Sequence, residues 1–171
     1  MAKILLVIAP ANFRDEELFV PKEFFESRKM AVDVASTVKT PVAGMLGRII
    51  SPNVLVSDVV LDEYDAVAFI GGIGVEDKKL YENPQFVNLA KLAFSRGKVV
   101  AAICIAPKIL ASAGILKNKK ATVSRTGKDY IKAKGAEYID RDVVQDGLLV
   151  TASGPDAARK FAEAIYGILS A

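Results

Sequence analysis

The sequence predicts a three-layer α/β/α sandwich with a mostly parallel central sheet. Short apolar runs alternate along the chain with segments of helical spacing, which is the pattern of successive βαβ units. The runs are continuously apolar rather than alternating, as expected of strands that helices cover on both faces. At 171 residues the chain has the length of one such sandwich, so we expect a single domain over residues 1–171.

The first part of the chain is expected to supply three strands and one long helix. The apolar runs predict strands at Ile4–Ala9, Met30–Ser36 and Ala66–Ile70. The first two flank a predicted helix over Asp15–Lys29, with Asp15 as a suitable N-cap. Pro41–Asn53 contains two prolines and two glycines and predicts a hairpin or an extension of the sheet.

The second part continues the alternation. A helix is expected from Asn83-Pro84 to Arg96-Gly97, where glycine suits the C′ position, and it precedes the apolar strand Val99–Ile103. Asp146-Gly147 predicts a tight turn between the last two strands. Ser153-Gly154-Pro155 combines a cap residue with an early proline and is expected to open the last helix.

The composition excludes several kinds of site. The chain has no histidine and one cysteine, which removes Cys-His dyads, Ser-His-Asp triads, intramolecular disulfides and His-based metal sites. We therefore expect neither a metal nor a cofactor. The net charge of +3 is spread along the chain without a basic run, so no nucleic-acid partner is expected. The apolar start Ile4–Ala11 is too short to span a membrane and no cleavage pattern follows it, so we expect a cytoplasmic protein without membrane contact.

Cys104 follows the strand Val99–Ile103 directly and precedes a helix expected to start near Ile105. The thiol is thus placed at a sharp strand-to-helix turn, at the edge where open α/β sheets bind ligands. Free N–H groups and the helix dipole there favour the thiolate and lower the pKa of the thiol. Cys104 is a candidate nucleophile; a small buried hydrophobe is the alternative, and the turn by itself leaves both open.

Two other segments are expected at the same edge. Gly71-Gly72 follows the strand Ala66–Ile70, and glycine there lets backbone amides approach a ligand, as an oxyanion hole requires. A phosphate loop is the weaker alternative, because no nucleotide-binding spacing follows. Glu17 stands in the first helix, four residues before Pro21, which has no N–H for the carbonyl of Glu17. Its carboxyl group is a candidate for the site, and a first-turn acid that favours the helix dipole is the alternative.

In this order the motifs resemble those of the ThiJ/PfpI superfamily over essentially the whole chain. They are Glu-Leu-x-x-Pro from Glu17, the glycine pair Gly71-Gly72, Ala-Ala-Ile-Cys at Ala101–Cys104, Gly-Ala-Glu-Tyr at Gly135–Tyr138, Asp146-Gly147 and Thr-Ala-Ser-Gly-Pro at Thr151–Pro155. The resemblance implies a flavodoxin-like sandwich, a nucleophilic Cys104 in strained backbone geometry, and Glu17 hydrogen-bonded to its sulfur. It also implies a homo-oligomer, since dimers and hexamers occur in the superfamily. Because a charged carboxylate would repel a thiolate, we expect burial to keep Glu17 protonated.

The chain departs from the superfamily where relatives carry histidine. Ile105 stands where the protease branch has a histidine after the nucleophile. Ser124 or its neighbour Arg125 stands where the deglycase branch has one on a nearby strand, and Ala106 replaces a usual glycine. We expect Ser124 and Arg125, with Gly71, to support a pocket whose opening is lined by residues 73–79 and 123–127.

These residues favour a cofactor-independent enzyme that acts on small reactive carbonyls or on their adducts with proteins. Cys104 would add to the aldehyde, Glu17 would transfer protons, and the N–H groups of Gly72 and Ile105 would hold the oxyanion. Two alternatives stay open. One is an intracellular cysteine peptidase or amidase of the PfpI type, which the missing histidine disfavours. The other is a non-enzymatic redox or stress sensor, or a chaperone, in which Cys104 oxidises to a sulfinate.

Overall fold

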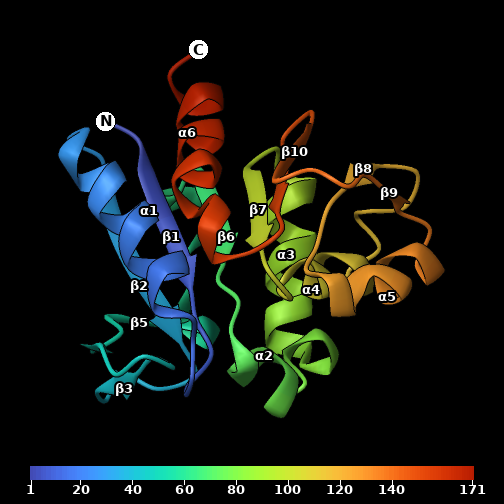
Figure 1. The fold of residues 1–171 in the computed structure, drawn as a ribbon. Helices are drawn as coiled ribbons and strands as arrows, with labels where there is room; N and C mark the ends of the chain where they lie inside the picture. Colours follow the sequence, from blue (N-terminus) through green and yellow to red (C-terminus); the bar gives the residue numbers. More distant parts are fainter.

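The computed structural model describes all 171 residues, and its centre is a seven-stranded sheet (Figure 1). The strand order is β10-β11-β7-β6-β1-β2-β5, and every neighbouring pair is parallel except β10 with β11. The strands of this sheet are β1 (Lys3–Val7), β2 (Ala31–Ser36), β5 (Val54–Leu55), β6 (Ala66–Phe69), β7 (Val99–Ile103), β10 (Val143–Asp146) and β11 (Leu149–Ala152). The predicted mostly parallel sheet is confirmed.

Two short strand pairs lie outside the central sheet. β3 (Val42–Ala43) and β4 (Ile49–Ile50) form an antiparallel hairpin inside the segment for which a hairpin was predicted. β8 (Lys120–Ala121) pairs in parallel with β9 (Glu137–Tyr138). The predicted turn between β10 and β11 is also present, and Gly147 has a φ of +61° there, which suits glycine.

Helices cover both faces of the sheet. They are α1 (Asp15–Ser27), α2 (Ile73–Asp77), α3 (Pro84–Ser95), α4 (Pro107–Ser112), α5 (Lys128–Ala133) and α6 (Ala158–Leu169). α1 and α6 pack together on one face, and α3 and α4 pack together on the other (Figure 1). None of these helices is both long enough and apolar enough to cross a membrane.

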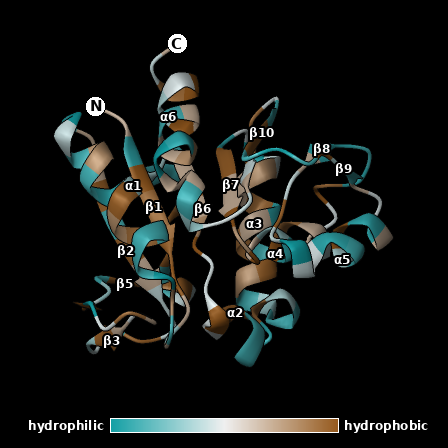
Figure 2. Cartoon of the chain, in the orientation of Figure 1, coloured by the Kyte–Doolittle hydropathy of each residue, from teal (hydrophilic) through white to brown (hydrophobic).

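Each face of the sheet has its own hydrophobic core, and β1 contributes to both. Ile4 and Leu6 belong to the core under α1 and α6, whereas Leu5 and Val7 belong to the core under α3 and α4. Successive strand residues point to opposite faces, so a strand buried on both sides must be apolar at every position. Strands β1 and β7 are accordingly brown in Figure 2, while much of α5, at the outside, is teal.

Two predicted helix starts are wrong in detail. Arg14 occupies the N-cap position of α1, and Asp15 is the first helical residue. The Asp15 carboxylate instead accepts hydrogen bonds from the amides of Leu46 and Arg48, at 2.8 and 2.9 Å, and thereby holds the β3–β4 hairpin. Gly154, and not Ser153, occupies the N-cap position of a 3-10 turn over Pro155–Ala157 that leads into α6, and the predicted early proline is the first residue of that turn.

The predicted ends of α3 are confirmed. The side chain of Asn83 caps the helix by accepting a hydrogen bond from the amide of Gln85 at 2.9 Å, and Pro84 is the first helical residue. Gly97 follows the C-cap with a φ of +72°, a conformation that favours glycine.

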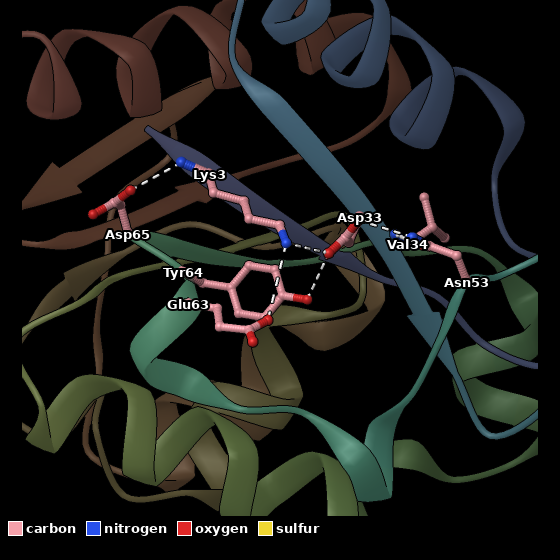
Figure 3. A network of polar contacts seen from close by, with 7 residues as sticks. All are labelled: Lys3, Asp33, Val34, Asn53, Glu63, Tyr64 and Asp65. Carbon is pink, nitrogen blue, oxygen red and sulfur yellow. Dashed lines mark hydrogen bonds and ion pairs between the residues drawn. The ribbon is translucent and has the colours of Figure 1, made fainter. Parts of the chain in front are cut away.

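A polar network joins the segment around β5 and β6 to β1 and β2 (Figure 3). Asp33 on β2 accepts hydrogen bonds from Lys3 Nζ, Asn53 Nδ2 and Tyr64 Oη at 2.9, 2.8 and 2.7 Å. Asn53 in turn accepts a hydrogen bond from the amide of Val34 at 2.8 Å. Burial opposes ionisation of Asp33, but the three donors outweigh it and hold the pKa of this carboxyl below its usual value.

Candidate active site

Cys104 lies at a strained turn directly after β7. Its φ is +64°, in the left-handed region that non-glycine residues rarely adopt. Two backbone hydrogen bonds hold this conformation: the amide of Cys104 donates to Ala152 O at 2.8 Å, and the amide of Ser124 donates to Cys104 O at 2.7 Å. Because β11 and the segment after β8 both contribute, the surrounding structure maintains a conformation that costs on the order of 1–3 kcal/mol. The strained elbow implied by the resemblance is confirmed.

Glu17 lies behind Cys104 and is completely buried. Its Oε1 accepts a hydrogen bond from the amide of Gly71 at 3.0 Å, and its Oε2 has no partner in hydrogen-bonding geometry, so the implied bond to the sulfur of Cys104 stays a prediction. Gly71 also sets the spacing of the two side chains. A Cβ at this position would lie 2.5 Å from Glu17 Oε1 and 2.7 Å from the Cβ of Cys104, so the site has room only for glycine.

Burial dominates the proton affinities of this pair. It raises the pKa of Glu17 from 4.5 to about 8, against the opposing effects of Cys104, the amide of Gly71 and the charge of Arg14. Glu17 therefore carries a proton at neutral pH, as predicted.

The prediction of a lowered thiol pKa is wrong. Burial, and then the neighbouring carboxyl group of Glu17, raise the pKa of Cys104 to about 12, while the amide of Ile105 and the hydroxyl of Ser124 lower it. The helix dipole contributes little because α4 begins only at Pro107 and has six residues. While Glu17 is protonated it carries no charge and does not repel the thiolate. Burial is then the main cause that raises the pKa of the thiol, and the Ile105 amide and the Ser124 hydroxyl oppose it.

Cys104 opens into a pocket of about 280 Å³. The residues that line it are Arg14, Met45, Gly72, Ile73, Glu76, Cys104, Ile105, Ser124, Thr126 and Pro155. Gly72, Ile105 and Ser124 were predicted at the site and are present in the lining. Glu17 and Gly71 are not in it, since they lie behind the sulfur. Arg125 is exposed and outside the lining, so its predicted supporting role is not upheld.

Three features of the lining bear on its chemistry. Gly72 has a φ of +116°, and a Cβ there would lie 2.5 Å from the amide nitrogen of Arg14, so the close approach of backbone requires glycine. The amides of Gly72 and Ile105 donate to no carbonyl of the protein, which leaves them available as the predicted oxyanion donors. The Ser124 hydroxyl is buried without a geometrically defined partner, although it lies close enough to Cys104 to lower the thiol pKa.

Sequence reasoning missed Arg14, Met45 and Pro155 as pocket residues. Arg14 immediately precedes α1, and its closeness in sequence to Glu17 is the signal that could have indicated it. Met45 comes from the β3–β4 hairpin, in which no local motif indicates a role at the site. No three side chains of metal-binding type converge anywhere in the structure.

Glu76 is the one carboxylate in the lining, and a buried lysine neutralises it. Lys108 Nζ lies 2.7 Å from Glu76 Oε1, and the Lys108 side chain is 9% exposed. The ammonium group also lies 3.8 Å from the ring centroid of Tyr81, whose hydroxyl donates to Glu76 Oε2 at 3.4 Å. Both oxygens of Glu76 thus have partners.

Comparison with known proteins agrees with this architecture. The model of the DJ-1/PfpI family matches residues 2–167. An uncharacterised protein of Methanocaldococcus jannaschii, MJ0967, is 48% identical over 94% of this chain and 78% of its own length. Deglycase TK1284 of Thermococcus kodakarensis is 36% identical, over 88% of this chain and 90% of its own. The glutathione-independent glyoxalase DJR-1.2 of Caenorhabditis elegans is 30% identical, over 92% and 83%.

A solved structure shows the same fold. The ThiJ/PfpI domain protein of Brachyspira murdochii superposes with a TM-score of 0.95 at 36% identity, over 98% of this chain and 96% of that one. The flavodoxin-like sandwich implied by the resemblance is therefore confirmed. With the family model, the sequence relatives and this structure in agreement, the chain belongs to the DJ-1/PfpI family.

Proposed function

We propose that this protein is a cysteine-dependent enzyme that acts on small reactive carbonyl compounds such as methylglyoxal, or on their adducts with amines and thiols. The observation that carries the proposal is the position of Cys104: a thiol at a strained elbow, open to a small pocket, with a protonated buried acid behind it. The names of two relatives, a deglycase and a glyoxalase, support the same class of reaction.

The first step is addition of the Cys104 sulfur to the aldehyde carbon. A sulfur–carbon bond forms, and the carbonyl π electrons move to oxygen, near the amides of Gly72 and Ile105. The thiol proton ends on that oxygen, which yields a neutral hemithioacetal. Glu17 is suited to pass this proton, since its pKa of about 8 lies near neutrality.

For methylglyoxal, the second step moves a proton from the sulfur-bearing carbon to the neighbouring carbonyl carbon, and the hydroxyl proton of the hemithioacetal moves to the oxygen of that carbonyl. The product is a lactate thioester of Cys104, and water then hydrolyses it to lactate and the free thiol. The sum is methylglyoxal plus water to lactate, so no external oxidant or reductant is required. Glu17 is fully buried and does not line the pocket, so it acts on a substrate only after the substrate is bonded to Cys104.

A peptidase reaction has weaker support. The position beside the nucleophile is the aliphatic Ile105, and the hydroxyl of Ser124 has no base behind it. Peptide hydrolysis by cysteine needs a base that also protonates the leaving amine.

Lactate formation from methylglyoxal tests the proposal. We expect Cys104→Ser to lose activity by at least about 1,000-fold, because the nucleophile is removed, and Glu17→Gln to lose about 100-fold or more, because the proton carrier is removed. Circular dichroism of each variant checks that the fold is intact. Equal turnover by the wild type and Cys104→Ser would refute the proposal.

A further inference from the structure

Arg14 is the one positively charged residue that lines the pocket beside Cys104. Its backbone amide donates to Gly71 O at 2.9 Å, which ties it to the loop that also holds Glu17. Its Nε donates to Glu16 Oε2 at 2.6 Å. Glu16 does not line this pocket but a separate hollow beside Phe19. The guanidinium is therefore anchored from outside the pocket through Nε.

The terminal nitrogens of Arg14 have no acceptor within the protein, since the bond from Nε is the only side-chain hydrogen bond that Arg14 makes. Glu76, the one carboxylate of the lining, differs in this respect. Its Oε1 is paired with Lys108 and its Oε2 accepts from Tyr81. Of the two charged side chains in the pocket lining, Arg14 thus has unused hydrogen-bond donors, whereas both oxygens of Glu76 are already paired. This difference favours an anionic ligand over a cationic one.

Planar guanidinium groups with two free nitrogens match the geometry of a carboxylate, which they bind through two parallel hydrogen bonds. Building on the proposed function, we infer that Arg14 selects 2-oxoaldehydes that carry a carboxylate, binding that group while Cys104 adds to the aldehyde carbon. The apolar residues Met45, Ile73 and Pro155 line the same pocket and suit the short carbon chain between the two ends. A volume of about 280 Å³ suits a small molecule of this kind.

The carboxylate takes no part in the bond changes. Cys104 forms the hemithioacetal, a proton moves from the sulfur-bearing carbon to the adjacent carbonyl carbon while the hydroxyl proton moves to that carbonyl's oxygen, and water hydrolyses the resulting thioester. The product is a 2-hydroxy acid with a second carboxylate, and no electrons enter or leave the substrate as a whole. Arg14 is therefore expected to act on KM more than on kcat.

The test compares 4,5-dioxopentanoate with 2-oxopentanal, which has the same carbon chain but no carboxylate. We expect the wild type to favour the acid by about 10- to 100-fold in kcat/KM, the range of charge-assisted bidentate pairs. Arg14→Met should abolish this ratio, and Arg14→Lys should retain part of it. Arg141→Met removes the charge of an exposed arginine outside the pocket and should leave the ratio unchanged. Since any effect of Arg14 on the sulfur acts on both substrates, it cancels in the ratio.

A second measurement does not depend on turnover. 4-Oxobutanoate and butanal can add reversibly to a thiol, but they lack the second carbonyl that the proton shift needs. We expect 4-oxobutanoate to protect Cys104 from alkylation by iodoacetamide at about 10-fold lower concentration than butanal, and Arg14→Met to remove the difference.

These outcomes separate the two hypotheses. Turnover of both oxoaldehydes with equal kcat/KM would overturn the role of Arg14 and leave the proposed function standing. Absence of turnover of either compound, with selective protection by 4-oxobutanoate, would overturn the proposed function and support the carboxylate site. Equal protection by both aldehydes would overturn the inference.

Discussion

At the scale of single residues, the buried proton of Glu17 makes stability depend on pH in an unusual direction. The pKa of Glu17 is about 8 in the folded protein and near 4.5 when unfolded, because burial penalises the carboxylate. Between these values the native state holds a proton that the unfolded chain releases, so rising pH lowers the free energy of unfolding. This group should contribute a loss of roughly 3 kcal/mol between about pH 5 and about pH 7.5.

Glu17→Gln should remove this loss, because the amide is neutral in both states. Urea unfolding of the wild type and the variant at the two pH values gives the free energy of unfolding. This free energy should decrease more for the wild type than for Glu17→Gln as the pH rises. Glu23→Gln is the matched control: this glutamate lies on the same helix with an exposed side chain, and its variant should follow the wild type. Parallel behaviour of Glu17→Gln and the wild type would contradict a buried, protonated Glu17.

At the scale of elements, one carboxylate connects α1 to the hairpin that carries Met45 into the pocket. Asp15 accepts hydrogen bonds from the amides of Leu46 and Arg48, and its carboxylate fills the space where a Cβ of Gly44 would lie. Asp15→Ala leaves two amides without their partner and should lower the free energy of unfolding by about 1–3 kcal/mol.

Hydrogen exchange at the Leu46 and Arg48 amides measures the loss of their hydrogen bonds to Asp15 directly, and both amides should exchange faster in Asp15→Ala. Glu23→Ala removes a different contact between α1 and the same hairpin, an exposed ion pair with Arg48 at 3.5 Å. It should leave the protection of both amides unchanged, since exposed pairs contribute little. Unchanged protection in Asp15→Ala would show that backbone hydrogen bonds, such as that from the Met45 amide to Phe13 O, hold the hairpin without the Asp15 carboxylate.

At the scale of the whole molecule, the Asp33 network and the site lie toward opposite ends of the parallel strands. Lys3 begins β1 and Asp65 immediately precedes β6, whereas Cys104 follows the end of β7 (Figures 1 and 3). Asp33→Ala removes the acceptor of three donors and should cost about 2–3 kcal/mol in urea unfolding while the kinetic constants of the folded enzyme stay unchanged.

Asp62→Ala provides the comparison for Asp33→Ala. Asp62 also pairs with a cation, Arg96 at 3.4 Å, but its side chain is 84% exposed, so its loss should cost less than about 0.5 kcal/mol. A drop in kcat/KM of folded Asp33→Ala would show that the two ends of the sheet are coupled.

Local features of the sequence determined much of the fold and the position of the nucleophile. Continuous apolar runs predicted the buried parallel strands, because a strand covered on both faces has no polar position. Asn83 and Gly97 marked the ends of α3 through interactions within a few residues of the chain. The elbow at Cys104 was predictable for the same reason, since a strand, a cysteine and, after two intervening residues, a helix follow one another along the chain.

The electrostatics and the lining of the site were determined only by the tertiary structure. Glu17 bonds to Gly71, which is 54 residues away, and the burial that raises the pKa of both Glu17 and Cys104 comes from several segments at once. The sequence suggested a lowered thiol pKa because it showed the following helix and not the surrounding core. Arg14 and Met45 reach the pocket through contacts between distant segments, and desolvation and pocket shape depend on which segments meet rather than on their order along the chain.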